Sequence, residues 1–173
     1  GSFIPGFEEQ VMSELNDLDM AKVTFKAEIT PCEDLGTRGA DTIEFLISTN
    51  LGEPLKPLAK IASGGEMSRI MLAFKTVLAQ NEHIGTLIFD EIDTGISGIT
   101  ASIVGRKLKE ISRHHQIICI THLPQIAACG DYNFRIYKES DETSTFTTVE
   151  RLDGEQQIRE IARLLGGDHI TET

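Results

Sequence analysis

The sequence has 173 residues, of which 40% are apolar and 25% charged, which is enough for one globular domain with a buried core. Its 16 basic and 27 acidic residues give a formal net charge of -11, which excludes a polybasic protein that binds nucleic acid or acidic membranes through its overall charge. No apolar run approaches the roughly 18 residues of a membrane span, and the start lacks a secretory signal. Three cysteines without a CxxC pair fit buried thiols in a reducing cytosol.

The first half of the chain predicts two helices and two strands. Apolar residues at helical spacing mark residues 7–20 as an amphipathic helix, which so near the start is expected to be the stub of a longer one. Alternating apolar residues predict half-buried strands at 22–30 and 41–49, joined by a loop at 31–40 that contains Gly36 and Gly39. A long helix begins at Ser63 and continues to about Gln80.

The second half alternates short apolar strands with helices. Strands are predicted at 86–89 and 117–120, each followed by a helix, the second of which is a short piece at 124–129. Continuous apolar strands that alternate with helices are typical of a parallel sheet covered on both faces, so the fold class is α/β. A peripheral antiparallel hairpin of 133–139 and 144–152 follows, and then a closing helix at 156–165, stopped by Gly166 and Gly167.

Polar side chains follow both apolar strands, where ligands of open α/β sheets bind. Asp90 could hold Mg²⁺ directly or through water, and Glu91 would place a second carboxylate near a nucleophilic water, the two groups that phosphoryl transfer needs. His122 follows the second strand and could donate a hydrogen bond to a terminal phosphate. Each also has a plain interpretation: solvated acids at a strand end, and a histidine in a loop.

The start of the long helix is a candidate anion site. Ser63, Gly64 and Gly65 leave backbone N–H groups bare at a helix N-terminus, where the helix dipole favours negative charge. Ser63 with Glu66 is equally a capping box, which needs no ligand.

In this order, the three elements resemble the C-terminal lobe of an ABC-type ATPase head. The stretches are A-S-G-G-E-M-S-R, L-I-F-D-E-I-D-T-G and I-T-H-L-P-Q, which are similar to a signature motif, a Walker B motif with its D-loop, and a switch histidine. Ile92 and Asp93 after the glutamate are typical of the SMC branch, whereas a transporter subunit usually has proline there. The likeness covers about residues 7–167, and Ser97 departs from the aspartate with which many relatives end the D-loop.

The resemblance implies an ATP-dependent ATPase of DNA double-strand break repair and recombination, cytoplasmic and associated with the nucleoid. Two heads would sandwich ATP and Mg²⁺ and form a homodimer, and the full-length protein would bind DNA. The resemblance implies catalytic roles for Glu91 and His122 and the binding of Mg²⁺ by Asp90. It also implies that the signature residues contact the nucleotide bound by the partner head. The implied sites are the signature residues Ser63, Gly64, Gly65 and Glu66, and the D-loop residues Asp93, Thr94 and Gly95.

One expected part is missing from the sequence. No G-x-x-x-x-G-K-[ST] phosphate loop occurs in it. The resemblance places that loop in an N-terminal lobe of the same protein, beyond a long coiled coil. We therefore expect residues 1–20 to be the returning end of the coiled coil and residues 21–173 to be the C-terminal lobe, inactive alone.

Two alternatives remain open at this stage. The chain could be a non-catalytic lobe that kept the ABC fold for partner binding, and the sequence upstream would decide between the two by containing or lacking a phosphate loop. A transporter subunit is disfavoured by Ile92. The basic residues between Arg106 and His115 are interpreted as a solvated helix face rather than a DNA contact, because no aromatic residues are interleaved.

Overall fold

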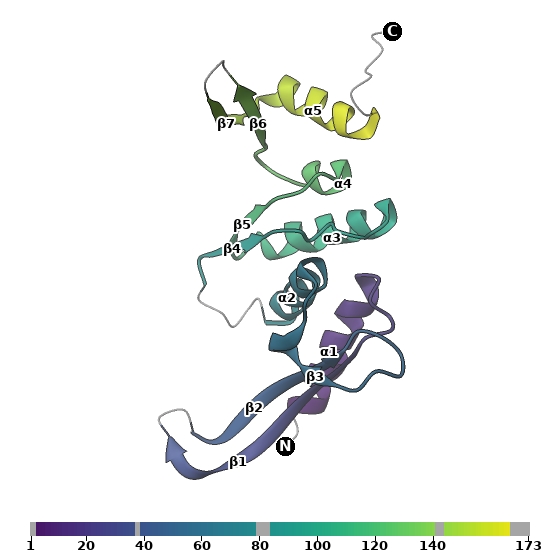
Figure 1. Cartoon of the computed structure of the whole chain (residues 1–173), viewed down its shortest axis with the longest axis vertical. Coiled ribbons are helices and arrows are strands. Elements are labelled where there is room, and N and C mark those ends of the chain that lie inside the picture. Colours follow the sequence, from purple (N-terminus) through teal and green to yellow (C-terminus); the bar gives the residue numbers. More distant parts are fainter. Residues whose placement is uncertain (1–2, 37–38, 79–83, 141–143, 167–173) are drawn as a thin grey trace.

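The computed structural model describes residues 3–36, 39–78, 84–140 and 144–166. Within them, the helices and strands follow one another along the long axis of the molecule, from α1 and the β1–β2 hairpin at one end to α5 and the β6–β7 hairpin at the other (Figure 1). The elements are α1 (Phe3–Asp17), β1 (Thr24–Gly36), β2 (Gly39–Ser48), β3 (Lys56–Pro57), the 3-10 helix η1 (Leu58–Lys60), α2 (Gly64–Leu78), β4 (Thr86–Phe89), α3 (Gly98–Ile111), β5 (Gln116–Cys119), α4 (Pro124–Ala127), β6 (Phe134–Ser140), β7 (Thr145–Arg151) and α5 (Gly154–Gly166).

The mixed α/β class is confirmed, and the described strands form three small sheets: antiparallel β1-β2-β3, parallel β4-β5 and antiparallel β6-β7. The predicted loop at 31–40 is wrong for residues 31–36 and 39–40, which belong to strands, and residues 37 and 38 lie outside the described part. β1 continues to Gly36 and β2 begins at Gly39, and these two glycines pair with each other. The pairing register shifts between Pro31 and Gly36, and such an irregularity is where a strand tolerates proline.

Other predicted boundaries shift by a few residues. The N-terminal helix, predicted at 7–20, spans Phe3–Asp17. The short helix after β5 ends at Ala127, not at residue 129. The long helix begins at Gly64, directly after Ser63, and is described to Leu78, so its predicted last residues, 79 and 80, lie outside the described part. Gly167, the second expected stop of the closing helix, also lies outside it.

A cluster of four phenylalanines joins the N-terminal elements into one core. Phe7 of α1 stacks against Phe74 of α2, with ring centroids 6.0 Å apart. Phe25 of β1 meets Phe74 edge to face at 5.2 Å, and Phe45 of β2 completes the cluster. Each such aromatic pair adds about 0.5–1.5 kcal/mol beyond the area it buries, so α1 packs as an integral part of this core.

Helix α1 is also tied to α3 by charge. Lys107 of α3 forms ion pairs with Glu14 and with Asp17 of α1, the second at 3.0 Å. Burial disfavours the charged Lys107, but its hydrogen bonds to the two carboxylates outweigh burial and raise its pKa above the ordinary value. The positive charge of Lys107 therefore serves to hold α3 on α1.

The β4-β5 sheet is covered on one face only, which corrects the expectation of two covered faces. Phe89 of β4 is 4% exposed and belongs to the core with α3 residues such as Val104, whereas the neighbouring Ile88 is 68% exposed. Successive side chains of a strand point to opposite faces, so Ile88 and the exposed Ile118 of β5 mark the other face as open within the described residues.

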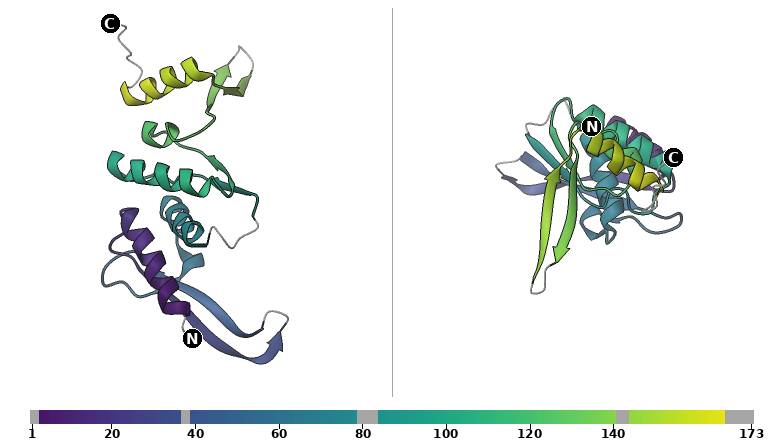
Figure 2. Two further views of the ribbon diagram at one scale, coloured as in Figure 1. Left: turned by 180° about the vertical axis from the view of Figure 1, so that it is seen from behind. Right: turned by 90° about the horizontal axis from the view of Figure 1, so that it is seen from above.

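The C-terminal hairpin also has an uncovered apolar side. Phe134 and Ile136 of β6 and Val149 of β7, which pairs with Ile136, share one face and are exposed. Seen along the long axis, the hairpin projects to one side of the helices (Figure 2). Among the described helices, none has the length and apolar character needed to span a bilayer.

Candidate nucleotide site

The parallel pairing of β4 and β5 brings the predicted acids and the predicted histidine to one sheet edge. Phe89 is in register with Cys119, and the Ile120 N–H donates to the Phe89 carbonyl at 2.9 Å. The chain therefore leaves both strands at the same level, toward Asp90 and Glu91 from β4 and toward His122 from β5. This edge is the place where open parallel sheets bind ligands.

Asp90 and Glu91 are both exposed at the end of β4. One oxygen of Asp90, Oδ1, accepts a hydrogen bond from the Glu91 N–H at 2.9 Å, and the Asp90 carbonyl accepts one from the Ser68 hydroxyl of α2 at 2.6 Å. Glu91 has φ of 56°, in the left-handed region, where a non-glycine residue costs about 1–3 kcal/mol and is often found at functional sites. The hydrogen bonds around Asp90 hold this turn.

The donor set fits Mg²⁺ only as part of a complex with phosphates. In the described part of the chain no three His, Cys, Asp or Glu side chains come together as a metal site. Mg²⁺ usually keeps several waters and is bound through one or two carboxylates together with substrate phosphates. A single exposed carboxylate at a strand end, as Asp90 provides, meets that requirement.

The predicted helix cap at Ser63 is formed. The Glu66 N–H donates to the Ser63 hydroxyl at 3.3 Å, and the Met67 N–H donates to the Ser63 carbonyl at 3.0 Å. The carboxylate of Glu91 lies against this same helix end: a Cβ on Gly64 would stand 2.0 Å from Glu91 Oε2. A negative carboxylate at a helix N-terminus is electrostatically favoured. The structure thus brings together, within one chain, two groups that the resemblance assigns to different nucleotides.

A side chain added at Gly65 would meet backbone atoms, whereas one added at Gly64 would meet the side chain of Glu91. A Cβ on Gly65 would lie 3.0 Å from the Glu91 carbonyl oxygen and 3.1 Å from Thr94 Cβ. We expect Gly65→Ala to lower the free energy of unfolding by about 1–3 kcal/mol, because backbone must shift. Gly64→Ala should change it by less than about 0.5 kcal/mol, because the exposed Glu91 side chain can turn away. Urea denaturation followed by circular dichroism measures both, and equal losses would contradict this packing.

Asp93, Thr94 and Gly95, the predicted D-loop, follow Glu91 in a turn held from inside the protein. Thr94 donates its N–H to the Glu91 carbonyl at 3.1 Å, and Gly95 has φ of 75°. Asp93 is buried, and its carboxylate accepts hydrogen bonds from Thr121 and from the backbone of His122. The predicted D-loop is therefore anchored on the loop that carries the histidine.

Arg69 is a site residue that sequence reasoning missed. It is buried in α2, and its Nη1 donates to the Thr94 carbonyl at 2.9 Å and to the Ile92 carbonyl at 3.3 Å. Burial lowers its pKa below the ordinary value, against the favourable charges of Glu66 and Asp19. The signal was present in the sequence, because an arginine beside apolar residues on the buried face of a helix requires carbonyl or carboxylate partners.

Two other sequence features take structural roles. Ser97, the departure from the expected D-loop ending, is the N-cap of α3 and accepts a hydrogen bond from the Thr100 N–H at 3.3 Å. Cys119 is half-buried at the end of β5, where burial, with smaller contributions from Asp93 and Asp90, raises the pKa of its thiol to about 12. This thiol stays protonated and poorly reactive at neutral pH.

The basic residues between Arg106 and His115 do not form one charged face. Lys107 is paired with α1, as described above, and Lys109 forms an ion pair with Asp131. His115 is buried, with Nδ1 2.6 Å from the carbonyl oxygen of Ile84. Pairing and burial therefore remove much of the basic character that this segment has in the sequence.

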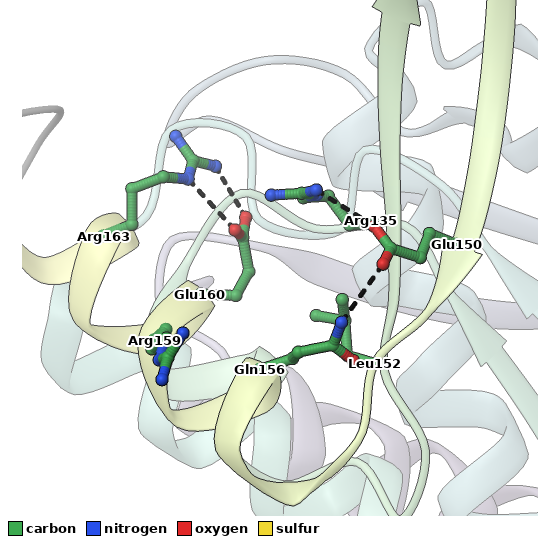
Figure 3. A pocket seen from close by; sticks show the side chains of 7 residues that line it. All are labelled: Arg135, Glu150, Leu152, Gln156, Arg159, Glu160 and Arg163. Atoms are coloured by element: carbon green, nitrogen blue, oxygen red, sulfur yellow. Dashed lines mark hydrogen bonds and ion pairs between the residues drawn. The ribbon is translucent and has the colours of Figure 1, made fainter.

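A cavity of about 310 Å³ between the β6–β7 hairpin and α5 was not anticipated from the sequence. Figure 3 shows that charged side chains line it, and its arginines are paired with glutamates: Arg135 with Glu150 at 2.9 Å, and Arg163 with Glu160 at 2.6 Å. Hydrogen bonding from Arg163 lowers the pKa of Glu160. The first pair lies within the hairpin and the second within α5, and in both the charges compensate each other. The link between the two elements is the hydrogen bond that Gln156 Nε2 of α5 donates to Glu150 Oε1 at 3.2 Å.

Comparison with known proteins decides the family. No protein-family model matches the chain. DNA repair protein RecN of Vibrio cholerae is 44% identical over 167 residues, which are 96% of this chain and 30% of that protein. DNA repair protein RecN of Treponema pallidum is 48% identical over 173 residues, again 96% of this chain and 30% of that protein. The chain belongs to the RecN family. It spans about 30% of the length of these curated RecN relatives.

Solved structures similar to this RecN segment are SMC heads. The SMC head domain with a coiled coil and joint from Pyrococcus yayanosii matches with a TM-score of 0.60 and 19% identity, over 92% of this chain and 29% of that one. A structure from work on ATP-driven dimerization and DNA-stimulated activation of SMC ATPases matches with a TM-score of 0.53 and 18% identity, over 95% of this chain and 94% of that one. At this identity the match shows that the RecN segment has the SMC head fold.

Proposed function

We propose that this segment is the C-terminal lobe of an ATPase head in a protein that repairs and recombines broken DNA, in the cytoplasm and at the nucleoid. The observation that carries the proposal is the single sheet edge at which Asp90 and Glu91 leave β4 and His122 leaves the loop after β5, with the N-terminus of α2 against Glu91. The RecN family and the SMC head fold support the same function.

Each residue at this edge has a task in ATP hydrolysis. Asp90 would hold Mg²⁺, which when bound neutralises charge on the phosphates. Glu91 orients the attacking water and accepts its proton, a role that suits an exposed carboxylate on a turn of fixed backbone conformation. His122 would contact an oxygen of the terminal phosphate, and Thr94 and Gly95 of the D-loop would join this site to its partner head.

The second contribution of this lobe is made to another nucleotide. Ser63, Gly64, Gly65 and Glu66 at the start of α2 would meet the phosphate bound by a second head in a homodimer, through bare N–H groups and the helix dipole. In this chain the carboxylate of Glu91 lies at that helix end. A phosphate that reaches Gly64 therefore repels Glu91 and moves it, which is possible because the side chain is exposed.

The uncovered apolar surfaces suit a second lobe of the same protein. Ile88 and Ile118 on the β4-β5 sheet and Phe134, Ile136 and Val149 on the hairpin would be covered by the N-terminal lobe that carries the phosphate loop. Residues 1–20, which include α1, would be the returning end of the coiled coil, and Phe7 of α1 joins it to residues 21–173 through the phenylalanine core. DNA contact belongs to the full-length protein.

Calorimetry and ATPase assays test the proposal. This chain alone should neither bind Mg-ATP tightly nor hydrolyse it, because the phosphate loop supplies most backbone donors for the triphosphate. The full-length protein should hydrolyse ATP, and Asp90→Asn should abolish that activity, whereas Asp131→Asn, at an exposed acid paired with Lys109, should not. Sub-micromolar ATP binding by this chain, or full activity of the Asp90→Asn protein, would contradict the proposal and favour a non-catalytic lobe.

A further inference from the structure

The most completely bonded acid near the sheet edge is Asp93. Its side chain is 4% exposed, and one oxygen, Oδ2, receives the Thr121 hydroxyl at 2.6 Å and the His122 N–H at 2.8 Å. The same oxygen lies 3.0 Å from Nδ1 of the His122 ring, which is itself 72% exposed. A buried carboxylate needs such donors, because without them its loss of hydration is costly.

These bonds fix both the backbone and the ring of the histidine. The Thr121 hydroxyl that donates to Asp93 also accepts the Leu123 N–H at 3.1 Å, so residues 121–123 are held by one carboxylate and one hydroxyl. The hydrogen bond made by one ring nitrogen of a histidine determines which nitrogen carries the proton. With Nδ1–H directed at Asp93, Nε2 is the nitrogen left for a ligand at the open edge.

We propose that Asp93 is a positioning residue for His122, acting within its own chain, rather than a residue that contacts the partner head across the dimer. The proposal rests on the proposed function, in which His122 meets a terminal phosphate. Asp93 fixes the ring so that Nε2 meets the phosphate oxygen, and it ties the D-loop to the histidine loop. A change at either loop is thereby transmitted to the other through a single carboxylate.

The state of the His122 ring in this chain is the first test, and it needs neither ATP nor a second lobe. Nitrogen NMR of the wild-type chain, at a pH where the ring is neutral, should find the proton on Nδ1. Asp93→Ala should abolish that preference, and Asp93→Asn, which can keep an oxygen at the same place, should restore it in part. A neutral wild-type ring protonated on Nε2 would overturn the proposal, even if the alanine variant fails to fold.

The second test is kinetic and uses the full-length protein. Asp93→Ala should lower kcat about 10- to 100-fold, as is typical when the hydrogen-bond partner of a metal-binding histidine is removed, and change KM for ATP much less. Asp93→Asn should recover part of kcat, and the control Asp131→Ala should match wild type. An active wild-type protein whose kcat is unaffected by Asp93→Ala would overturn the positioning role. A wild-type protein without ATPase activity would instead contradict the proposed function, while the NMR result still decides the contact.

Discussion

Replacing Glu91 with glutamine in the full-length protein should lower ATP hydrolysis by about 10²- to 10⁴-fold and leave ATP binding intact. The amide keeps the shape of the side chain but cannot accept a proton from water, and positioned general bases contribute about that factor. The backbone of Glu91 is already set by its left-handed conformation and by the bond from its N–H to Asp90, so the substitution should not move the turn. Steady-state turnover and nucleotide binding measure the two effects separately.

The Glu91→Gln substitution should also trap the ATP-bound dimer of heads. If hydrolysis releases the dimer of heads, the Glu91→Gln protein should accumulate as an ATP-bound dimer on gel filtration. Glu110→Gln, at an exposed position on α3, is the matched control and should behave as wild type. Unchanged turnover with no extra dimer would mean that Glu91 is not the base and that its position at the helix end serves structure alone.

The parallel sheet was the most predictable part of the fold. The strand at residues 86–89 is a continuous apolar run that ends in two acids, and the structure places β4 at Thr86–Phe89. Such a pattern locates a strand well, because a short strand of a parallel sheet contains few polar residues. The first polar residues after the apolar run therefore mark the end of the strand. The hairpin and the closing helix were also predictable, because turn residues separate the segments whose apolar residues recur at strand or helix spacing.

The pairing of strands was harder to predict from the sequence than the strands themselves. Gly36, Gly39 and Pro31 have the composition of a loop, yet the ladder of β1 and β2 continues through this segment after a shift in register. A ladder is stabilised by bonds between two segments, so neither segment alone reports it. The open face of the β4-β5 sheet was missed for a similar reason. The apolar side chain of Ile88 predicts a buried position, and only the structure shows that this residue is exposed among the described residues.

At the candidate site, residue types were predictable and contacts were not. The order of strand ends predicts that Asp90 and His122 share an edge, because parallel strands end together. It does not predict that Asp93 bonds to the loop of His122, or that Arg69 holds the carbonyls of Ile92 and Thr94. Such contacts join residues 23 to 29 positions apart and depend on side-chain burial, which local patterns leave undetermined.

Ser63→Arg in the full-length protein should nearly abolish ATP hydrolysis while each head still binds ATP. A bulky cation at the start of α2 would keep the signature residues of that chain away from the partner's nucleotide, whereas Asp90 and Glu91 of the same chain would keep their own nucleotide. The loss of the cap bond from the Glu66 N–H should cost about 1 kcal/mol of stability. Ser63→Ala loses that cap without adding bulk, so a comparison of the two variants at low temperature separates obstruction from destabilisation.

Mixing two inactive proteins tests whether Ser63 serves the partner's nucleotide. In a heterodimer of the Ser63→Arg protein and one with its phosphate-loop lysine replaced, one composite site carries both defects and the other carries neither. The mixture should therefore hydrolyse ATP faster than either protein alone. If Ser63 acted on the nucleotide of its own chain, each site of the heterodimer would carry one defect and no activity would return. Heterodimers that form and stay inactive would thus assign the start of α2, like the adjacent Glu91, to the nucleotide of its own chain.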